Sequence, residues 1–170
     1  TLFTTSAGPH LVGGQWAPLH RQLLGLPYGE LAASPEAELC RAGLALLEGR
    51  PLALIANDCQ QLGGAVDAQA SEKAARFLRL CDALGLPVLS LTDTPGFMVG
   101  PDSEKQGAVR SMSSLFLAGA AMTVPVVAVF LRKGYGLGAM AMTGGSFVRP
   151  VYAASWPTGE FGGMGLEGAV

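Results

Sequence analysis

Three glycine-rich segments of the chain combine features that could hold a ligand through the backbone. They cover residues 93–100, 132–139 and 156–165, and each contains an aromatic residue among its glycines. Glycine lets a ligand approach the backbone amides closely because it has no side chain, while an aromatic ring supplies an apolar wall. These segments are therefore the candidate site of the chain.

The side chains offer few means of catalysis by a titrating group. No nucleophile elbow or Ser, His and Asp grouping stands out, and His10 and His20 lie in a stretch without a sustained pattern. Backbone N–H groups at the start of a helix could instead stabilise negative charge on an oxygen. Leu137, Gly138 and Ala139 stand at such a position. The simpler interpretation is that these glycines only permit a tight turn from strand to helix.

The second segment also matches a dinucleotide-binding pattern in form. Gly136-x-Gly138-x-x-Ala141 follows an expected strand and precedes an expected helix. Such a site usually follows the first strand of the sheet, with an acid about 20 residues further on, near the end of the second strand. Here the next expected strand ends at Trp156, and Glu160 belongs to another glycine-rich segment. We therefore do not favour NAD binding.

The elements that would position these segments are strands that alternate with helices. Residues 86–91 follow one expected helix and residues 124–130 follow the next, with Pro87 and Pro125 lying 38 residues apart. A helix followed by a buried strand, repeated at this spacing, predicts βαβ units and a parallel sheet. Ligands bind beyond the carboxyl ends of such strands, which is where the glycine-rich segments stand.

Local patterns predict the other elements. Residues 43–47 and 51–56 predict a β-hairpin, because a turn with glycine separates two apolar runs. Residues 68–84 predict an amphipathic helix that ends at Gly85, with Cys81 in its apolar face. Ser34 could open a short helix as its N-cap, and Ser103 with Gln106 forms a capping box at the start of an expected helix over 103–122. We also expect a short helix over 139–143 and a strand over 147–156.

The composition favours one ordered domain. Of the 170 residues, 49% are hydrophobic, 14% are charged and 24 are glycine, so the chain can bury a core and is not disordered. A net charge of −2 with scattered basic residues disfavours nucleic acid as a partner. Residues 115–131 would rise only about 25 Å as one helix, which is short of the roughly 30 Å of a bilayer core. We expect no membrane span.

The cysteines and histidines indicate neither a disulfide framework nor a metal site. Cys40, Cys59 and Cys81 are odd in number and share no CxxC spacing, while His10 and His20 have no further ligand at metal-binding spacing. The cysteines fit a reducing, cytoplasmic location, and Cys81 fits a core position better than a reactive thiol. The chain shows no initiator Met and no signal-peptide pattern, and we interpret it as a fragment.

An ordered set of short motifs resembles one enzyme family over residues 43–170, whereas residues 1–42 show no clear match. The motifs are Gly49-Arg50, Lys73-Ala74-Ala75-Arg76-Phe77, Cys81-Asp82-Ala83, Asp93-Thr94-Pro95-Gly96-Phe97, Arg132-Lys133-Gly134-Tyr135-Gly136, Trp156-Pro157-Thr158 and Met164-Gly165-x-x-Gly168-Ala169-Val170. The set is similar to the C-terminal half of the carboxyltransferase subunit of biotin-dependent acyl-CoA carboxylases, such as the propionyl-CoA and acetyl-CoA carboxylase beta chains. The resemblance implies an α/β domain with the ClpP/crotonase-like ββα superhelix.

The resemblance also implies a reaction and the residues that would serve it. Family members move a carboxyl group from carboxybiotin to the α-carbon of an acyl-CoA, and a pair of backbone amides forms an oxyanion hole. That pair falls on Leu137 and Gly138 when the family's loop is aligned without a gap from Tyr135. It falls on Gly138 and Ala139 when the local Gly-Ala is matched, and both alignments stay open. The implied substrate-side and biotin-side residues are Pro95, Gly96, Phe97, Gly136 and Met140, the last standing where many members carry an acid that influences acyl-group choice.

The implied partners extend beyond this chain. They are an acyl-CoA substrate, biotin as carboxybiotin on a partner carrier protein or domain, a biotin carboxylase component, an N-terminal-type carboxyltransferase domain and further subunits in a homo- or hetero-oligomer. Arg132 and Lys133 could meet a phosphate or a bicarbonate-derived carboxylate, or form a solvated pair at a strand end.

Two alternative functions keep the same fold. One is a decarboxylase of a malonyl-type CoA or a hydratase, for which Glu160 is the single acid in a suitable loop. The other is a non-catalytic domain retained for assembly. Dependence on biotin distinguishes the carboxyltransferase from the decarboxylase or hydratase. A bulky residue at Gly138 should lower the activity of an enzyme, whereas it should leave the full assembly unaffected if the domain is not catalytic.

Overall fold

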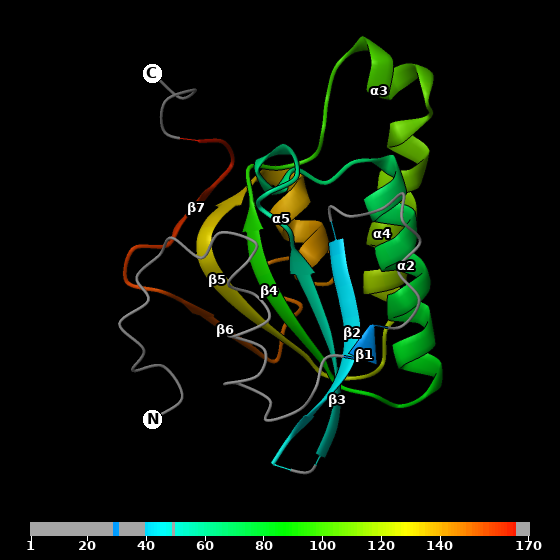
Figure 1. Cartoon of the computed structure of the whole chain (residues 1–170), viewed down its shortest axis with the longest axis vertical. Helices are drawn as coiled ribbons and strands as arrows, with labels where there is room; N and C mark the ends of the chain where they lie inside the picture. Colours follow the sequence, from blue (N-terminus) through cyan, green and yellow to red (C-terminus); the bar gives the residue numbers. More distant parts are fainter. Residues whose placement is uncertain (1–28, 31–39, 49, 166–170) are drawn as a thin grey trace.

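One seven-stranded sheet organises the part of the chain that this computed structural model describes, residues 29–30, 40–48 and 50–165 (Figure 1). The order of strands across the sheet is β1-β2-β3-β4-β5-β6, and β7 also pairs with β5. The strands are β1 (Gly29–Glu30), β2 (Cys40–Leu47), β3 (Arg50–Asn57), β4 (Val88–Thr94), β5 (Val126–Tyr135), β6 (Tyr152–Ser155) and β7 (Glu160–Gly162). The helices are η2 (Leu62–Gly64), α2 (Ala68–Ala83), α3 (Pro101–Lys105), α4 (Ala108–Ala121) and α5 (Gly136–Met142).

The strand directions confirm the predicted hairpin and the predicted parallel sheet. β2 runs antiparallel to β1 and β3, whereas β3 with β4, β4 with β5, and β5 with β6 form parallel pairs. The parallel pairs need crossover connections, which contain α2 between β3 and β4, α3 and α4 between β4 and β5, and α5 between β5 and β6. Val88 pairs with Val126, so the 38-residue spacing seen in the sequence is also the register of β4 on β5.

The helices cover one face of the sheet. Figure 1 shows α2 and α4 side by side, and residues of α2, α4 and α5 share one apolar core with the sheet. Ala53 and Ile55 of β3 belong to this core, whereas Leu52 and Leu54 belong to a second apolar cluster. Because side chains alternate along a strand, the two clusters lie on opposite faces.

The helix α2 confirms the amphipathic pattern. Its first turn is capped by Asp67, whose carboxylate accepts a hydrogen bond of 2.7 Å from the amide of Ala70. Its end is marked by Gly85, which takes a left-handed φ of 66° as predicted for a helix stop. Cys81 is completely buried in the core, which also confirms its expected position.

The predicted helix over 103–122 is wrong in its first part. The structure has two helices here, α3 and α4, which are separated at Gln106 and Gly107. Gly107 has a φ of 70°, a conformation that glycine adopts readily and that ends a right-handed helix. Ser103 therefore lies inside α3, and neither helix has a side-chain cap, so the predicted capping box does not form.

The predicted ends of the later elements need correction. β5 extends to Tyr135, because β7 pairs with residues 133–135, and α5 begins at Gly136 rather than at 139. The expected strand over 147–156 shortens to β6, since residues 146–150 form turns and Pro150 has no N–H to pair. β7 itself lies inside the third glycine-rich segment, where no strand was expected.

The expected helix at Ser34, together with His10 and His20, falls outside the described residues. Within the described part, none of the helices combines the length and the apolar character that crossing a bilayer requires. Residues 115–131, the one apolar stretch long enough to raise the question, divide between α4 and β5.

Candidate functional site

Two of the segments that follow the parallel strands are joined to each other. Val66, which follows β3 and η2, forms a parallel bridge with Phe97 in the segment after β4. The amide of Val66 donates to the Gly96 carbonyl at 2.9 Å, and the amide of Met98 donates to the Val66 carbonyl at 2.8 Å. Backbone hydrogen bonds thus hold the first glycine-rich segment in place at the carboxyl edge of the sheet.

The second segment packs directly on the first through Gly138. A Cβ on Gly138 would lie 2.6 Å from the carbonyl carbon of Gly96 and 2.9 Å from the amide nitrogen of Phe97. Real side chains do not come so close, so only glycine permits this approach. Gly96 has a φ of 128°, which also favours glycine. The two glycines therefore bring the first turn of α5 against the loop after β4.

The first turn of α5 presents backbone N–H groups that the helix itself does not use. Tyr135 is extended and serves as the N-cap, so the amide of Ala139 is the first to reach a carbonyl within the helix, that of Tyr135. The amides of Leu137 and Gly138 come before it. The Leu137 residue is 60% exposed, whereas Gly138 and Ala139 are buried. Of the two amide pairs left open by the sequence, Leu137 and Gly138 have the better supply of unused donors.

A buried carboxylate supports the strand that leads into α5. Asp93 is 4% exposed, and its Oδ1 accepts from Nε of Arg132 at 3.3 Å and from the Lys133 amide at 3.1 Å. Its own amide donates to Oδ1 of Asn57 at 3.1 Å. Burial acts to lower the pKa of Arg132, but the interactions with Asp93 and Cys59 together raise this pKa. Arg132 is thus engaged with Asp93, which differs from both roles considered for it from the sequence.

A thiol lies beside this ion pair in its protonated form. Sγ of Cys59 donates to the backbone carbonyl of Asp93 at 3.6 Å. Burial raises the pKa of Cys59 to about 12, and the hydrogen bond and negative charge of Asp93 act in the same direction. A thiol with such a pKa is a poor nucleophile at neutral pH. Burial likewise raises the pKa of Cys81 to about 11.

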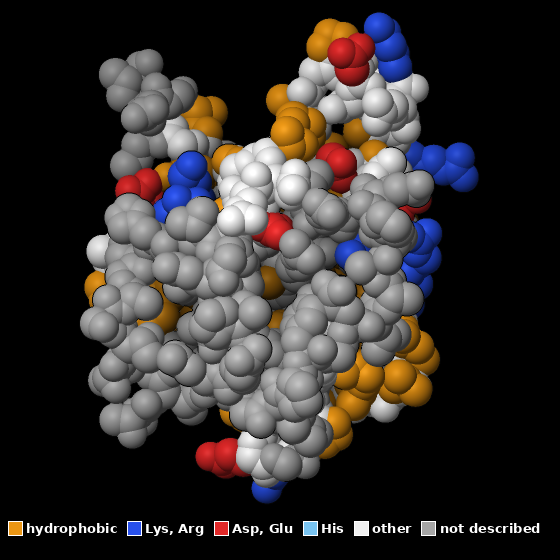
Figure 2. Space-filling model, viewed as in Figure 1, with side chains coloured by type: hydrophobic (Ala, Val, Ile, Leu, Met, Phe, Trp, Pro, Cys, Tyr) orange, Lys and Arg blue, Asp and Glu red, His pale blue; other side chains and the backbone are white. Residues whose placement is uncertain are grey.

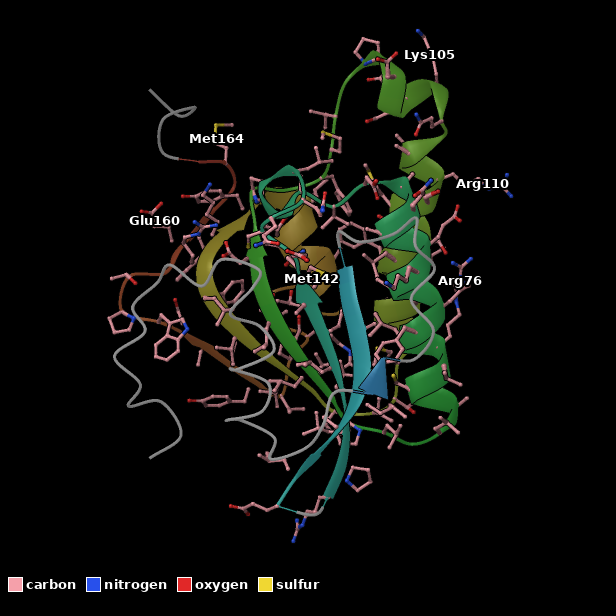
Figure 3. The ribbon with its side chains drawn as sticks, in the orientation of Figure 1. Arg76, Lys105, Arg110, Met142, Glu160 and Met164 are labelled. Carbon is pink, nitrogen blue, oxygen red and sulfur yellow. The ribbon has the colours of Figure 1, made fainter. Side chains whose placement is uncertain are left out.

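The third glycine-rich segment lies against the start of α5. The Tyr135 hydroxyl donates to the Glu160 carboxylate, and Gly165 lies against the Tyr135 ring. A Cβ on Gly136 would stand 3.2 Å from the Gly163 carbonyl oxygen. Figure 3 shows Glu160 on the β7 side of the molecule. Because its carboxylate accepts from Tyr135, Glu160 is already engaged, which leaves the hydratase alternative without specific support.

The structure brings most of the predicted site residues together, with different exposure. Gly96 and Gly138 touch, and Gly136 begins the same helix as Leu137, Gly138, Ala139 and Met140. Pro95 is exposed and Met140 is half-buried. The ring of Phe97 packs against Phe116 of α4, with a centroid distance of 6.0 Å. No group of three potential metal ligands lies together among the residues that the structure describes.

Sequence reasoning missed the contacts that support the loop after β4, although Asp93 itself belongs to the first glycine-rich segment. Asn57, Asp93 and Val66 hold the loop after β4, and a Cβ on Gly64 would collide with the Asp93 carbonyl oxygen. The glycine at 64 and the acid at the end of β4 were visible in the sequence. Their partners lie on other strands, which no local pattern reveals.

Comparison with known proteins places the chain in a family. The model of the carboxyl transferase domain matches residues 33–170. A relative from Mycobacterium tuberculosis, the biotin-dependent acetyl-/propionyl-coenzyme A carboxylase beta5 subunit, is 40% identical over 128 residues, which cover 75% of this chain and 23% of the relative. The chain therefore spans about a quarter of the length of this curated relative.

Solved structures agree with the family match. A single-chain, multi-domain long-chain acyl-CoA carboxylase is 58% identical with a TM-score of 0.78, covering 79% of this chain and 13% of that one. The hexameric transcarboxylase 12S with methylmalonyl-coenzyme A bound is 34% identical with a TM-score of 0.72, covering 78% and 26%. This chain belongs to the carboxyl transferase domain family. The resemblance drawn from the sequence and the predicted crotonase-like α/β fold are both confirmed.

Proposed function

We propose that residues 43–170 form the C-terminal-type domain of the carboxyltransferase component of a biotin-dependent acyl-CoA carboxylase. The activity is transfer of a carboxyl group from carboxybiotin to the α-carbon of an acyl-CoA. The contact between Gly138 and Gly96 carries this proposal, because it sets unused amides of α5 beside the loop that family members use on their biotin side. Membership of the carboxyl transferase domain family supports it.

The donors at the start of α5 fit a cyclic urea by their chemistry. A urea carbonyl oxygen accepts hydrogen bonds, and the amides of Leu137 and Gly138 precede the first bonded amide of the helix. When bound, carboxybiotin supplies a carboxyl group on a ring nitrogen, and its transfer moves negative charge toward the neighbouring oxygen. The two amides stabilise that charge without accepting or losing a proton. Gly138 has no side chain to cover them.

The acyl-CoA and the remaining partners belong to the same proposal. Met140 places an apolar, half-buried side chain where many family members carry an acid, which favours an acyl chain longer than propionyl. The similarity to a long-chain acyl-CoA carboxylase supports this choice. The other partners are an N-terminal-type domain, a biotin carboxyl carrier and a biotin carboxylase component within an oligomer, located in the cytoplasm.

A transfer assay on the complete assembly tests the proposal. The full-length protein that carries this chain is supplied with carboxybiotin and with acetyl-, propionyl-, methylcrotonyl- and palmitoyl-CoA. We expect carboxylation of at least one substrate and a loss of about 100-fold or more in Gly138→Ala, because the added Cβ displaces an oxyanion donor. Gly163→Ala is the matched control, since a Cβ there meets nothing within 4 Å.

The assay has clear opposing outcomes. Absence of transfer to every acyl-CoA in the complete assembly would overturn the proposal. Decarboxylation or hydration that proceeds without biotin would favour the alternative enzymes. Full activity of Gly138→Ala would favour a domain retained for assembly.

A further inference from the structure

A groove between α2 and α4 gathers positive charge away from the candidate site. It has a volume of about 220 Å³, and its lining residues come from both helices. Figure 3 shows Arg76 and Arg110 on the same outer side of this helix pair, and Figure 2 shows basic side chains along that edge. The lining consists of Glu72, Arg76, Arg79, Arg110, Ser111 and Ser114.

Two hydrogen bonds across the helices shape the groove. Oγ of Ser111 donates to the Glu72 carboxylate at 2.8 Å, and a guanidinium nitrogen of Arg79 donates to Oγ of Ser114 at 3.0 Å. Because Ser114 accepts in this bond, its own hydroxyl proton stays available for a ligand. The two bonds connect the α2 wall of the groove to its α4 wall.

The charges of the groove do not balance. Three guanidinium groups face one carboxylate, and Glu72 turns to Ser111 on α4 instead of pairing with Arg76 one turn away. Among the residues that the structure describes, neither Arg76 nor Arg110 has a carboxylate within ion-pair distance. The groove therefore carries a surplus of two positive charges and two arginines that can bind an anion.

We propose that this groove binds a phosphate monoester. A guanidinium group presents a planar fork of N–H donors that matches phosphate oxygens, and arginines from two helices can contact different oxygens of one group. The surplus of two positive charges matches the charge of a phosphate dianion better than that of a single carboxylate. The volume suits one phosphate with a small organic portion. The site lies on the helices rather than at the strand ends, so it is separate from the proposed transfer chemistry.

Calorimetric titration of the full-length protein that carries this chain tests this site. The probes are glycerol 3-phosphate, inorganic phosphate and succinate at constant ionic strength. We expect glycerol 3-phosphate to bind most tightly and its Kd to rise at least about tenfold in the double variant Arg76→Ala/Arg110→Ala, since each arginine supplies charge-assisted hydrogen bonds. Arg76→Lys keeps the charge without the fork, and we expect an intermediate loss.

The matched control removes the same charge elsewhere. Arg50→Ala/Lys105→Ala changes two exposed cations on β3 and α3, and we expect the Kd to stay within about twofold. Near-UV circular dichroism checks that every variant is folded. An equal loss of affinity in both double variants would show that only the net charge of the protein matters, and it would overturn the proposal. Equal affinity for inorganic phosphate and the ester would assign the groove to the free ion, and binding of neither would refute it.

Discussion

The carboxylate of Asp93 lies 3.2 Å from Nε of Arg132, and this ion pair ties the end of β4 to the second half of β5. The same carboxylate accepts from the Lys133 amide, while Asn57 of β3 accepts from the Asp93 amide. Three neighbouring strands are thus linked at their carboxyl ends. Because β5 passes into α5 at Tyr135, these bonds hold the approach to the candidate site.

Loss of the Asp93 carboxylate should destabilise the domain. Asp93→Ala leaves the guanidinium of Arg132 and the Lys133 amide without their acceptor in a largely buried place, so we expect a loss of about 2–3 kcal/mol in the free energy of unfolding. Arg132 is one-third exposed, which keeps the loss below that of a fully buried pair. Urea unfolding measures it. The control is Asp102→Ala, because the Asp102 carboxylate is exposed; we expect it to change the free energy of unfolding by about 0.5 kcal/mol or less. Equal losses in the two variants would contradict the structural role of Asp93.

An acid at position 140 should change the choice of acyl group. Met140→Asp replaces an apolar, half-buried side chain on α5 by a charge, which a long acyl chain cannot solvate. In the complete assembly we expect the ratio of kcat/KM for palmitoyl-CoA over propionyl-CoA to fall by about tenfold or more. Leu117→Asp, on an exposed position of α4, controls for the added charge. An unchanged ratio would remove Met140 from the specificity site.

The thiol of Cys59 should resist alkylation until high pH. Its pKa of about 12, against an ordinary value of 9.0, leaves about a thousandth of the usual thiolate at pH 8. In a Cys40→Ser/Cys81→Ser background, the alkylation rate of the folded chain should rise with a midpoint near pH 12, and that of the denatured chain near pH 9. A folded-state midpoint at or below 9 would show that the thiol is not held protonated.

The same shift has a consequence for stability. A raised pKa means that the Cys59 thiol keeps its proton up to a higher pH in the folded state than in the unfolded chain. The contribution of Cys59 is therefore complete below pH 9 and is lost as the pH rises from 9 toward 12. The difference in unfolding midpoint between the parent and Cys59→Ser should narrow over this range.

Stability in acid should depend on Asp82. The backbone amide of Thr123 is the first cause of the low pKa of this carboxylate, which also accepts from the Thr123 hydroxyl and the Val124 amide. A lowered pKa gives stability that is present above the ordinary value of 3.8 and disappears as the pH falls through the folded-state value.

Thermal melts of the parent and Asp82→Asn between pH 6 and the acid range check this dependence. The parent should lose melting temperature below pH 4 more steeply than the variant, because the variant has no carboxylate to protonate. Asp102→Asn should keep the steep profile of the parent. Parallel profiles for the parent and Asp82→Asn would contradict the assignment.

The sheet could be predicted because its pattern repeats. The 38-residue spacing between Pro87 and Pro125 set two helix-strand units in register, and the structure pairs Val88 with Val126 at that spacing. The hairpin and α2 were equally visible, since each depends on contacts between residues near in sequence. The split between α3 and α4 was not, because a helix tolerates an isolated glycine at a cost of about 1 kcal/mol and Gly107 did not reveal its left-handed φ.

The sequence singled out the segments that meet at the start of α5, and the role of their backbone amides stays a prediction. It did not reveal the contacts that support these segments. Charged Arg132 and Lys133 suggested the end of a strand, yet β7 and the buried Asp93 carry β5 on to Tyr135. The pairing of Asp93 depends on a register shift, since Thr94 pairs with Gly134, two residues later than the 38-residue spacing gives. Such irregularities arise from tertiary packing, and nothing local in the sequence marks them.

The contact between Gly138 and Gly96 has a mechanical consequence. Two backbones that touch without intervening side chains have no flexible atoms between them to absorb a displacement. A shift of the loop after β4 would therefore be passed to the first turn of α5, and the reverse. We therefore expect the loop and the first turn of α5 to move together, which would keep the ordering entropy of ligand binding small.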